Sequence, residues 1–156
     1  MVQVLKERRI LGLMTDLDTG AGGIPADFLG VEAMCPSGLA RLALRFQCSI
    51  MPIVKIRERP GVVTMYVEDE IHPHESESEA DTARALTRAV NAAFEPWIMS
   101  YPEQYNWLHP RWLSRPGERT LDVRACDEEL WRERSGPFPE LPDRVHSLLL
   151  DRQDAS

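Results

Sequence analysis

Two aspartates and one arginine are the side chains whose types and positions best suit polar chemistry. Asp16 and Asp18 directly follow a short apolar run, and Arg57 ends a second one. A carboxylate can orient a cation or bind a polar substrate group, and a guanidinium suits phosphate or a developing oxyanion. Ordinary structural roles fit as well, because Asp caps loops and Arg57 could form a surface salt bridge with Glu58 or Glu70. The residues alone leave both interpretations open.

Histidines supply a second group of candidates. His72 and His74 lie in residues 68–81, which contain seven acidic residues and no basic one. A His/Glu pattern of this kind can bind metal, but a segment so acidic is more typical of a solvated loop. A divalent cation on the Asp-x-Asp pattern is a further option. We expect no metal at either place.

The segment Tyr101–Pro116 concentrates aromatic, basic and proline residues. No amphipathic period explains its composition, and a surface loop rarely carries Tyr105, Trp107 and Trp112 so close together. His109 and Arg111 in the same segment could serve either catalysis or packing.

Hydrophobic periodicity and turn residues predict the elements that must position these side chains. In chain order we expect a buried strand over Arg9–Thr15, a loop over Gly20–Pro25, a helix starting at Pro36-Ser37, a strand over Ser49–Arg57, a turn over Glu58–Gly61, a strand over Val62–Val67 and a helix over Asp81–Ser100. Asp81 or Thr82 is the expected cap of the last helix. Strand, helix, strand and hairpin in this order predict an α/β layer with a right-handed crossover.

Length and charge limit the function classes. A chain of 156 residues suits one domain, and its net charge of −7 argues against a nucleic-acid partner. It contains no run of 18 apolar residues that would predict a membrane span.

Four blocks in a fixed order resemble the bacterial lipid A biosynthesis acyltransferases, the lauroyl/myristoyl transferases of the lysophospholipid acyltransferase superfamily. The blocks are Thr15-Asp-Leu-Asp-Thr-Gly20, Gly23-Ile-Pro-Ala-Asp-Phe-Leu-Gly30, Ile50-Met-Pro-Ile-Val-Lys-Ile-Arg57 and the Pro-Glu-Gln-Tyr-x-Trp-x-His-x-Arg-Trp-x-x-Arg-Pro run within Tyr101–Pro116. Leu17 departs from the family pattern, in which the centre of Asp-x-Asp is usually polar. The resemblance implies an α/β fold, here a partial acyltransferase-type layer with a mixed sheet, flanking helices and an irregular C-terminal tail. It covers about residues 5–117, so we assign residues 1–117 to the C-terminal portion of an acyltransferase domain and expect residues 118–156 to form a tail with short helices.

The same resemblance implies an activity and its partners. The family transfers an acyl chain from acyl-acyl-carrier-protein or acyl-CoA to a glycolipid or lysolipid hydroxyl at a membrane surface, without a cofactor. It makes Arg57, Asp16 and Asp18 the substrate- or phosphate-binding residues. The structural signature would consist of Trp107, His109, Arg111, Trp112 and Arg115, with His109 and Arg111 as clasps at the sheet end. The parent enzyme would lie on the cytoplasmic face of the inner membrane, whereas this chain without an anchor would be cytoplasmic or peripheral.

The catalytic base is the missing part. The family uses a His-x-x-x-x-Asp motif upstream of Asp-x-Asp, and no histidine precedes Asp16 here. His146 and Asp151 match the motif literally, but they follow the other blocks. In a helix they would also point about 140° apart. We therefore expect the C-terminal part of an acyltransferase, inactive alone. The alternative is a non-catalytic module of this family that binds lipid or a protein partner.

Overall fold

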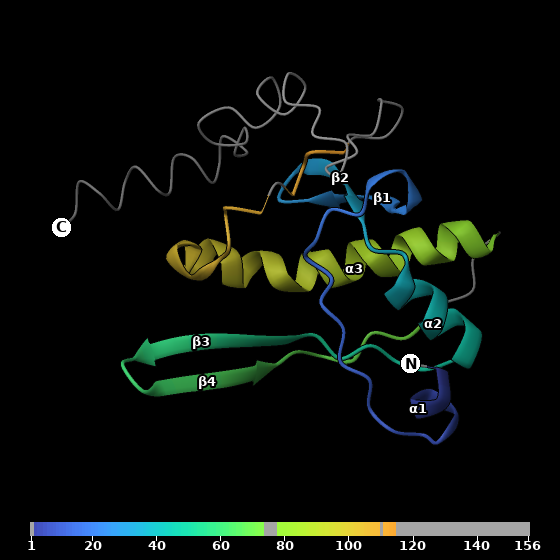
Figure 1. Cartoon of the computed structure of the whole chain (residues 1–156), viewed down its shortest axis with the longest axis horizontal. Helices are drawn as coiled ribbons and strands as arrows, with labels where there is room; N and C mark the ends of the chain where they lie inside the picture. Colours follow the sequence, from blue (N-terminus) through green and yellow to red (C-terminus); the bar gives the residue numbers. More distant parts are fainter. Residues whose placement is uncertain (1, 74–77, 110, 115–156) are drawn as a thin grey trace.

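A long central helix organises the part of the chain that the computed structural model describes, residues 2–73, 78–109 and 111–114. The elements are α1 (Val2–Lys6), η1 (Gly20–Gly22), β1 (Ile24–Phe28), β2 (Val31–Cys35), α2 (Gly38–Phe46), β3 (Ile53–Arg59), β4 (Val62–Val67), α3 (Glu79–Ser100) and η2 (Pro102–Gln104). Figure 1 shows the β1–β2 hairpin and the β3–β4 hairpin on opposite sides of α3. The expected α/β class is confirmed.

Helix α3 forms because its apolar residues recur at helical spacing and its first turn is capped. The Ser78 hydroxyl oxygen accepts from the Asp81 N–H at 3.1 Å, so the cap is Ser78 and not Asp81 or Thr82 as predicted. Three polar side chains on one side of the helix hold β1–β2. Arg84 donates to the Pro25 carbonyl at 2.8 Å, Asn91 donates to the Asp27 carbonyl at 2.6 Å, and Glu95 accepts from the Leu29 N–H at 2.8 Å.

The β1–β2 hairpin was not predicted as a hairpin. Its strands pair antiparallel from Ile24 opposite Cys35 to Phe28 opposite Val31. The tight turn places Leu29 and Gly30 at φ of 56° and 84°, the left-handed region that two-residue hairpin loops require. A leucine there, rather than Asn or Asp, hides the usual turn signal.

The β3–β4 hairpin was predicted, and its antiparallel pairing is confirmed. Strand β4 has the expected bounds, whereas β3 begins only after Pro52. Proline has no N–H to donate to a strand ladder, and here its carbonyl accepts from the Glu68 N–H at 3.0 Å. A register shift between Arg57 and Arg59 marks a bulge near the turn.

Two expectations about the sheet are wrong. Residues 9–15 form no strand, and Ile10 is 95% exposed. The run is apolar, but no described strand pairs with it, so its backbone stays outside any ladder. Because the described strands form two separate antiparallel pairs, the strand–helix–strand crossover is also absent among them.

Two apolar clusters meet at α3. One contains Phe28, Leu29, Ala33, Ile98 and Trp112, and the other contains Ala40, Ala43, Ile50, Ala83, Leu86 and Val90. Phe94 packs against both. Helix α2, where a helix was predicted, supplies Ala40 and Ala43 to the second cluster. No helix of the described ranges is long and apolar enough to cross a membrane.

Candidate functional site

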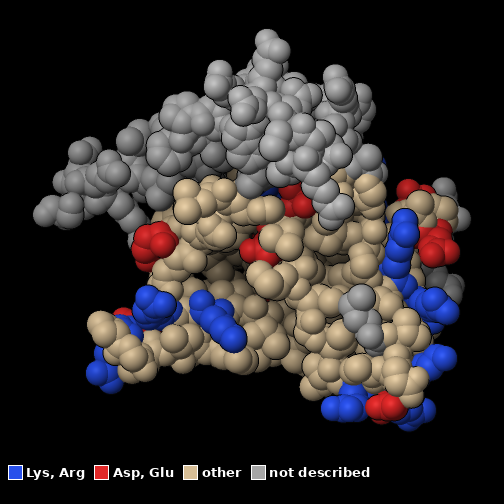
Figure 2. All heavy atoms as spheres, viewed as in Figure 1, with Lys and Arg blue, Asp and Glu red and all other residues tan. Residues whose placement is uncertain are grey.

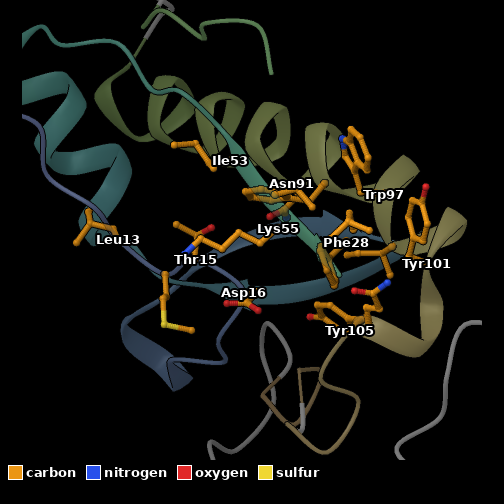
Figure 3. Close-up of a pocket in the computed structure, with 16 residues that line it drawn as sticks. Leu13, Thr15, Asp16, Phe28, Ile53, Lys55, Asn91, Trp97, Tyr101 and Tyr105 are labelled. Carbon is orange, nitrogen blue, oxygen red and sulfur yellow. The ribbon is translucent and has the colours of Figure 1, made fainter. Parts of the chain in front are cut away.

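A cavity of about 260 Å³ lies between α3 and strand β3. Residues 13–16, residues 53–56 of β3, the C-terminal half of α3 and residues 101–105 contribute to its walls, together with Phe28. Figure 3 shows Asp16 and Tyr105 on one side, and Asn91 and Trp97 of α3 on the other. The lining is mostly aliphatic and aromatic, with a few polar groups, as small-molecule sites usually are.

The charged groups of the lining are one carboxylate, Asp16, and one ammonium, Lys55. Tyr105 stands beside Asp16, and burial together with this negative charge raises the pKa of its phenol well above the usual value. A neutral phenol can both donate and accept a hydrogen bond. Asn91 is already engaged, because it donates to the Asp27 carbonyl at 2.6 Å. The cavity therefore offers an acceptor, a cation and a neutral hydroxyl to a ligand.

Asp18 belongs to a different place, although it is only two residues from Asp16. Its Oδ1 accepts from the Gly20 N–H at 2.9 Å, and its Oδ2 accepts from the Ser114 N–H at 2.9 Å. Its own N–H donates to His109 Nε2 at 2.8 Å. Asp18 thus joins the Asp-x-Asp loop to the aromatic segment.

Arg111 forms the buried centre of this junction. Only 1% of its surface is exposed. Its guanidinium lies 4.8 Å from the centroid of the Phe28 ring and donates to the Met34 carbonyl at 3.3 Å and to Cys35 Sγ at 2.9 Å. We call Asp18, His109, Arg111 and Ser114 the C-terminal clasp. Its contacts are with the Asp-x-Asp loop, with the end of β2 and with Phe28 of β1, which also lines the cavity.

The tryptophans of the predicted signature pack nearby. Trp112 is buried against Phe28, with ring centroids 5.8 Å apart, and its Nε1 has no hydrogen-bond partner among the described residues. Trp107 is half-buried and donates to the Pro102 carbonyl at 2.6 Å. Arg115 lies outside the described residues.

Arg57 is exposed and does not line the cavity. Its backbone is held at the edge of β3 by Gln104, whose Oε1 accepts from the Arg57 N–H at 2.8 Å and whose Nε2 donates to the Arg57 carbonyl at 3.2 Å. Within the described ranges Arg57 forms no salt bridge, since Glu58 accepts from the Tyr66 hydroxyl and Glu70 pairs with His72.

The structure therefore separates the three predicted binding residues. Asp16 lines the cavity, Asp18 lies in the clasp, and Arg57 lies on the outside of the hairpin. Sequence reasoning missed Lys55 and Tyr105 as cavity residues. Side chains two residues apart in a β-strand lie on the same face. The predicted strand could therefore have placed Lys55 on the same face as Arg57.

No group of three or more His, Cys, Asp or Glu side chains in the described segments is arranged to bind a metal ion. His72 lies 3.4 Å from Glu70, an exposed pair. His74, His146 and Asp151 lie outside the described residues, as does the tail 118–156.

Comparison with known proteins points to one family. The family model for bacterial lipid A biosynthesis acyltransferases matches residues 1–114. A phosphatidylinositol mannoside acyltransferase of Mycolicibacterium smegmatis is 26% identical over 114 residues, which cover 73% of this chain and 36% of the relative. A phosphatidylinositol mannoside acyltransferase of Mycobacterium tuberculosis is 27% identical over 122 residues, covering 78% and 37% respectively. The lipid A biosynthesis lauroyltransferase of Escherichia coli K12 is 29% identical over 118 residues, covering 74% and 38%. The chain thus spans a little over a third of the length of these curated relatives.

Proposed function

Because the chain belongs to the bacterial lipid A biosynthesis acyltransferase family, we propose that it forms part of an enzyme that acylates a glycolipid. The acyl group would come from acyl-acyl-carrier-protein or acyl-CoA. In this reaction a glycolipid hydroxyl attacks the thioester carbonyl, the thiol leaves, and a base takes the hydroxyl proton. The names of the relatives support a lipid A-type or a mannoside acceptor.

The cavity beside Asp16 is the observation that carries this proposal. Its position in the family-matched region and its largely apolar lining suit an acyl chain. Lys55 would face a phosphate or the developing oxyanion, and Asp16 would accept a hydrogen bond from the acceptor hydroxyl. Arg57, on the same strand, would bind phosphate at the outer side.

Acyl binding is testable with a fluorescent fatty acid and the 156-residue protein. Ile53→Trp places a larger side chain at the cavity wall and should weaken binding at least tenfold. Val63→Trp is the matched control, because Val63 lies on the paired strand and does not line the cavity. Equal affinities of the two variants would argue against this cavity as the acyl site.

We further propose that these 156 residues do not catalyse transfer alone. No histidine lines the described cavity, and His109 is engaged by Asp18. Purified protein incubated with acyl-acyl-carrier-protein or acyl-CoA and a glycolipid acceptor should show no acylation above background. Thioester-dependent acylation that disappears in His146→Ala would overturn this proposal and assign the base to the one His-x-x-x-x-Asp sequence present.

A non-catalytic lipid-binding module is the second candidate. The observation that favours it is the largely apolar lining of the described cavity, which suits an acyl chain and contains no histidine. Sequence upstream of Met1 distinguishes the two: an in-frame His-x-x-x-x-Asp and a hydrophobic anchor would favour the enzyme. Such an enzyme would lie on the cytoplasmic face of the inner membrane.

A further inference from the structure

The β3–β4 hairpin has one face that is apolar although it is exposed. We define the outer hairpin face as Ile53, Lys55, Arg57, Val63, Met65 and Val67, which the strand register pairs across the two strands. Val63, Met65 and Val67 are 58%, 54% and 56% exposed. A sheet face in contact with water normally carries polar residues. The three apolar residues that β4 presents on this face therefore need another explanation.

The opposite face of the hairpin is the one that packs against the fold. Tyr66 contacts Trp97 of α3 with ring centroids 4.4 Å apart, and Ile56 is buried. Trp97 also donates to Glu68 at 2.6 Å, just beyond β4. The hairpin is therefore anchored to α3 through the face that carries Tyr66, whereas Val63, Met65 and Val67 of the outer hairpin face are exposed.

The charged residues of the outer hairpin face are both basic. Lys55 and Arg57 lie opposite Met65 and Val63, and the acidic neighbour Glu58 accepts from the Tyr66 hydroxyl on the other face. Figure 2 shows Lys and Arg side chains over this hairpin. Cations beside exposed aliphatic groups complement a surface where phosphates lie above acyl chains. Two copies of this face would instead oppose like charges.

The outer hairpin face also continues into the cavity, because Ile53 and Lys55 belong to both. We propose that this face docks the protein on an anionic lipid bilayer, with Lys55 and Arg57 against phosphates and the β4 side chains at the boundary with the acyl chains. A lipid substrate would then reach the cavity directly from the surface. This last step rests on the proposed function, whereas docking itself rests on the hairpin.

Sedimentation of the 156-residue protein with lipid vesicles tests the docking. We expect binding to phosphatidylcholine vesicles that contain phosphatidylglycerol, much weaker binding to pure phosphatidylcholine, and a decline with added salt. Lys55→Gln combined with Arg57→Gln should weaken binding about thirtyfold, since each basic residue near such a surface contributes about 1 kcal/mol. Arg41→Gln with Arg45→Gln makes the same charge change on exposed positions of α2 and should leave binding near the wild-type value.

A second variant separates the apolar contribution from the charge. Met65→Asp should abolish vesicle binding, whereas Leu108→Asp, at an exposed leucine outside the hairpin, should not. Both positions are exposed, so equal unfolding midpoints would show that the fold is intact. Equal binding to neutral and anionic vesicles, or an equal loss in the α2 variant, would overturn the proposal. Self-association that Met65→Asp abolishes would also overturn it and assign the face to a protein interface.

The vesicle and fatty-acid experiments fail independently. Fatty-acid binding without vesicle binding would remove the docking proposal and leave the proposed function. Vesicle binding without fatty-acid binding would remove the proposed acyl site and leave the docking proposal.

Discussion

Asp16 and Asp18 are two residues apart in one pattern, yet they serve different parts of the molecule. Asp18 is fixed by hydrogen bonds to Gly20, His109 and Ser114, whereas Asp16 lines the cavity beside Tyr105. A carboxylate that already accepts two backbone N–H groups has little capacity left for a ligand. One that faces a cavity keeps its oxygens available. We therefore infer that Asp18 and the C-terminal clasp stabilise the fold, and that Asp16 and the cavity contact the ligand.

Arg111→Ala should give the largest loss of stability, because it removes a fully buried side chain from the clasp. It would leave a void beside Phe28 and an unpaired Met34 carbonyl, at a cost of about 3 kcal/mol or more in the free energy of unfolding. Urea unfolding measures this loss. Arg41→Ala, at an exposed position of α2, is the control and should change stability by no more than about 0.5 kcal/mol. Similar losses in the two variants would show that the clasp does not hold the fold.

The aspartates themselves provide the direct comparison. Asp18→Ala leaves two N–H groups without an acceptor and should cost about 2 kcal/mol, whereas Asp16→Ala should cost about 0.5 kcal/mol or less. Fatty-acid binding should respond to Asp16 and not to Asp18: Asp16→Ala should bind the fatty acid more tightly, because it removes a carboxylate that would face the carboxylate of the ligand. Paired unfolding and binding titrations check both. If Asp16→Ala destabilised the protein as much as Asp18→Ala, the division between clasp and cavity would be wrong.

The sequence predicted regular elements better than it predicted this division. Helix α3 and strand β4 have strong periodic patterns, and both were found. The β1–β2 hairpin was missed because its turn begins with Leu29 rather than a typical turn residue. The bond between Asp18 and His109 joins residues 91 positions apart, which no local pattern encodes. For residues 9–15 the error was the opposite one, because a strand was predicted and none is found. An apolar run does not indicate which other part of the chain would cover it.

Gln104 links the cavity to the outside of the hairpin, and its loss should have a smaller effect. Gln104→Ala removes two hydrogen bonds to the Arg57 backbone at an exposed edge, which predicts a loss of about 1 kcal/mol. Gln104→Glu keeps the acceptor for the Arg57 N–H but loses the donor to its carbonyl, so it should lie between wild type and Gln104→Ala. Thermal unfolding orders the three proteins. Identical midpoints would mean that the Gln104 contacts do not fix the strand edge.

The titration of Tyr105 should also distinguish Asp16 from Asp18. Burial first, and Asp16 second, raise the pKa of this phenol above the usual value of about 10. The stability that comes from keeping Tyr105 neutral is therefore present below pH about 10 and is lost as the pH rises further. Asp16→Asn removes a negative neighbour, so its Tyr105 should ionise at a lower pH than in wild type. Ultraviolet absorbance of the phenolate measures this, with Tyr105→Phe to assign the signal. Asp18→Asn should leave the titration unchanged, because Asp16 is the aspartate that stands beside the Tyr105 ring. An equal shift in both variants would place the two aspartates in one electrostatic environment.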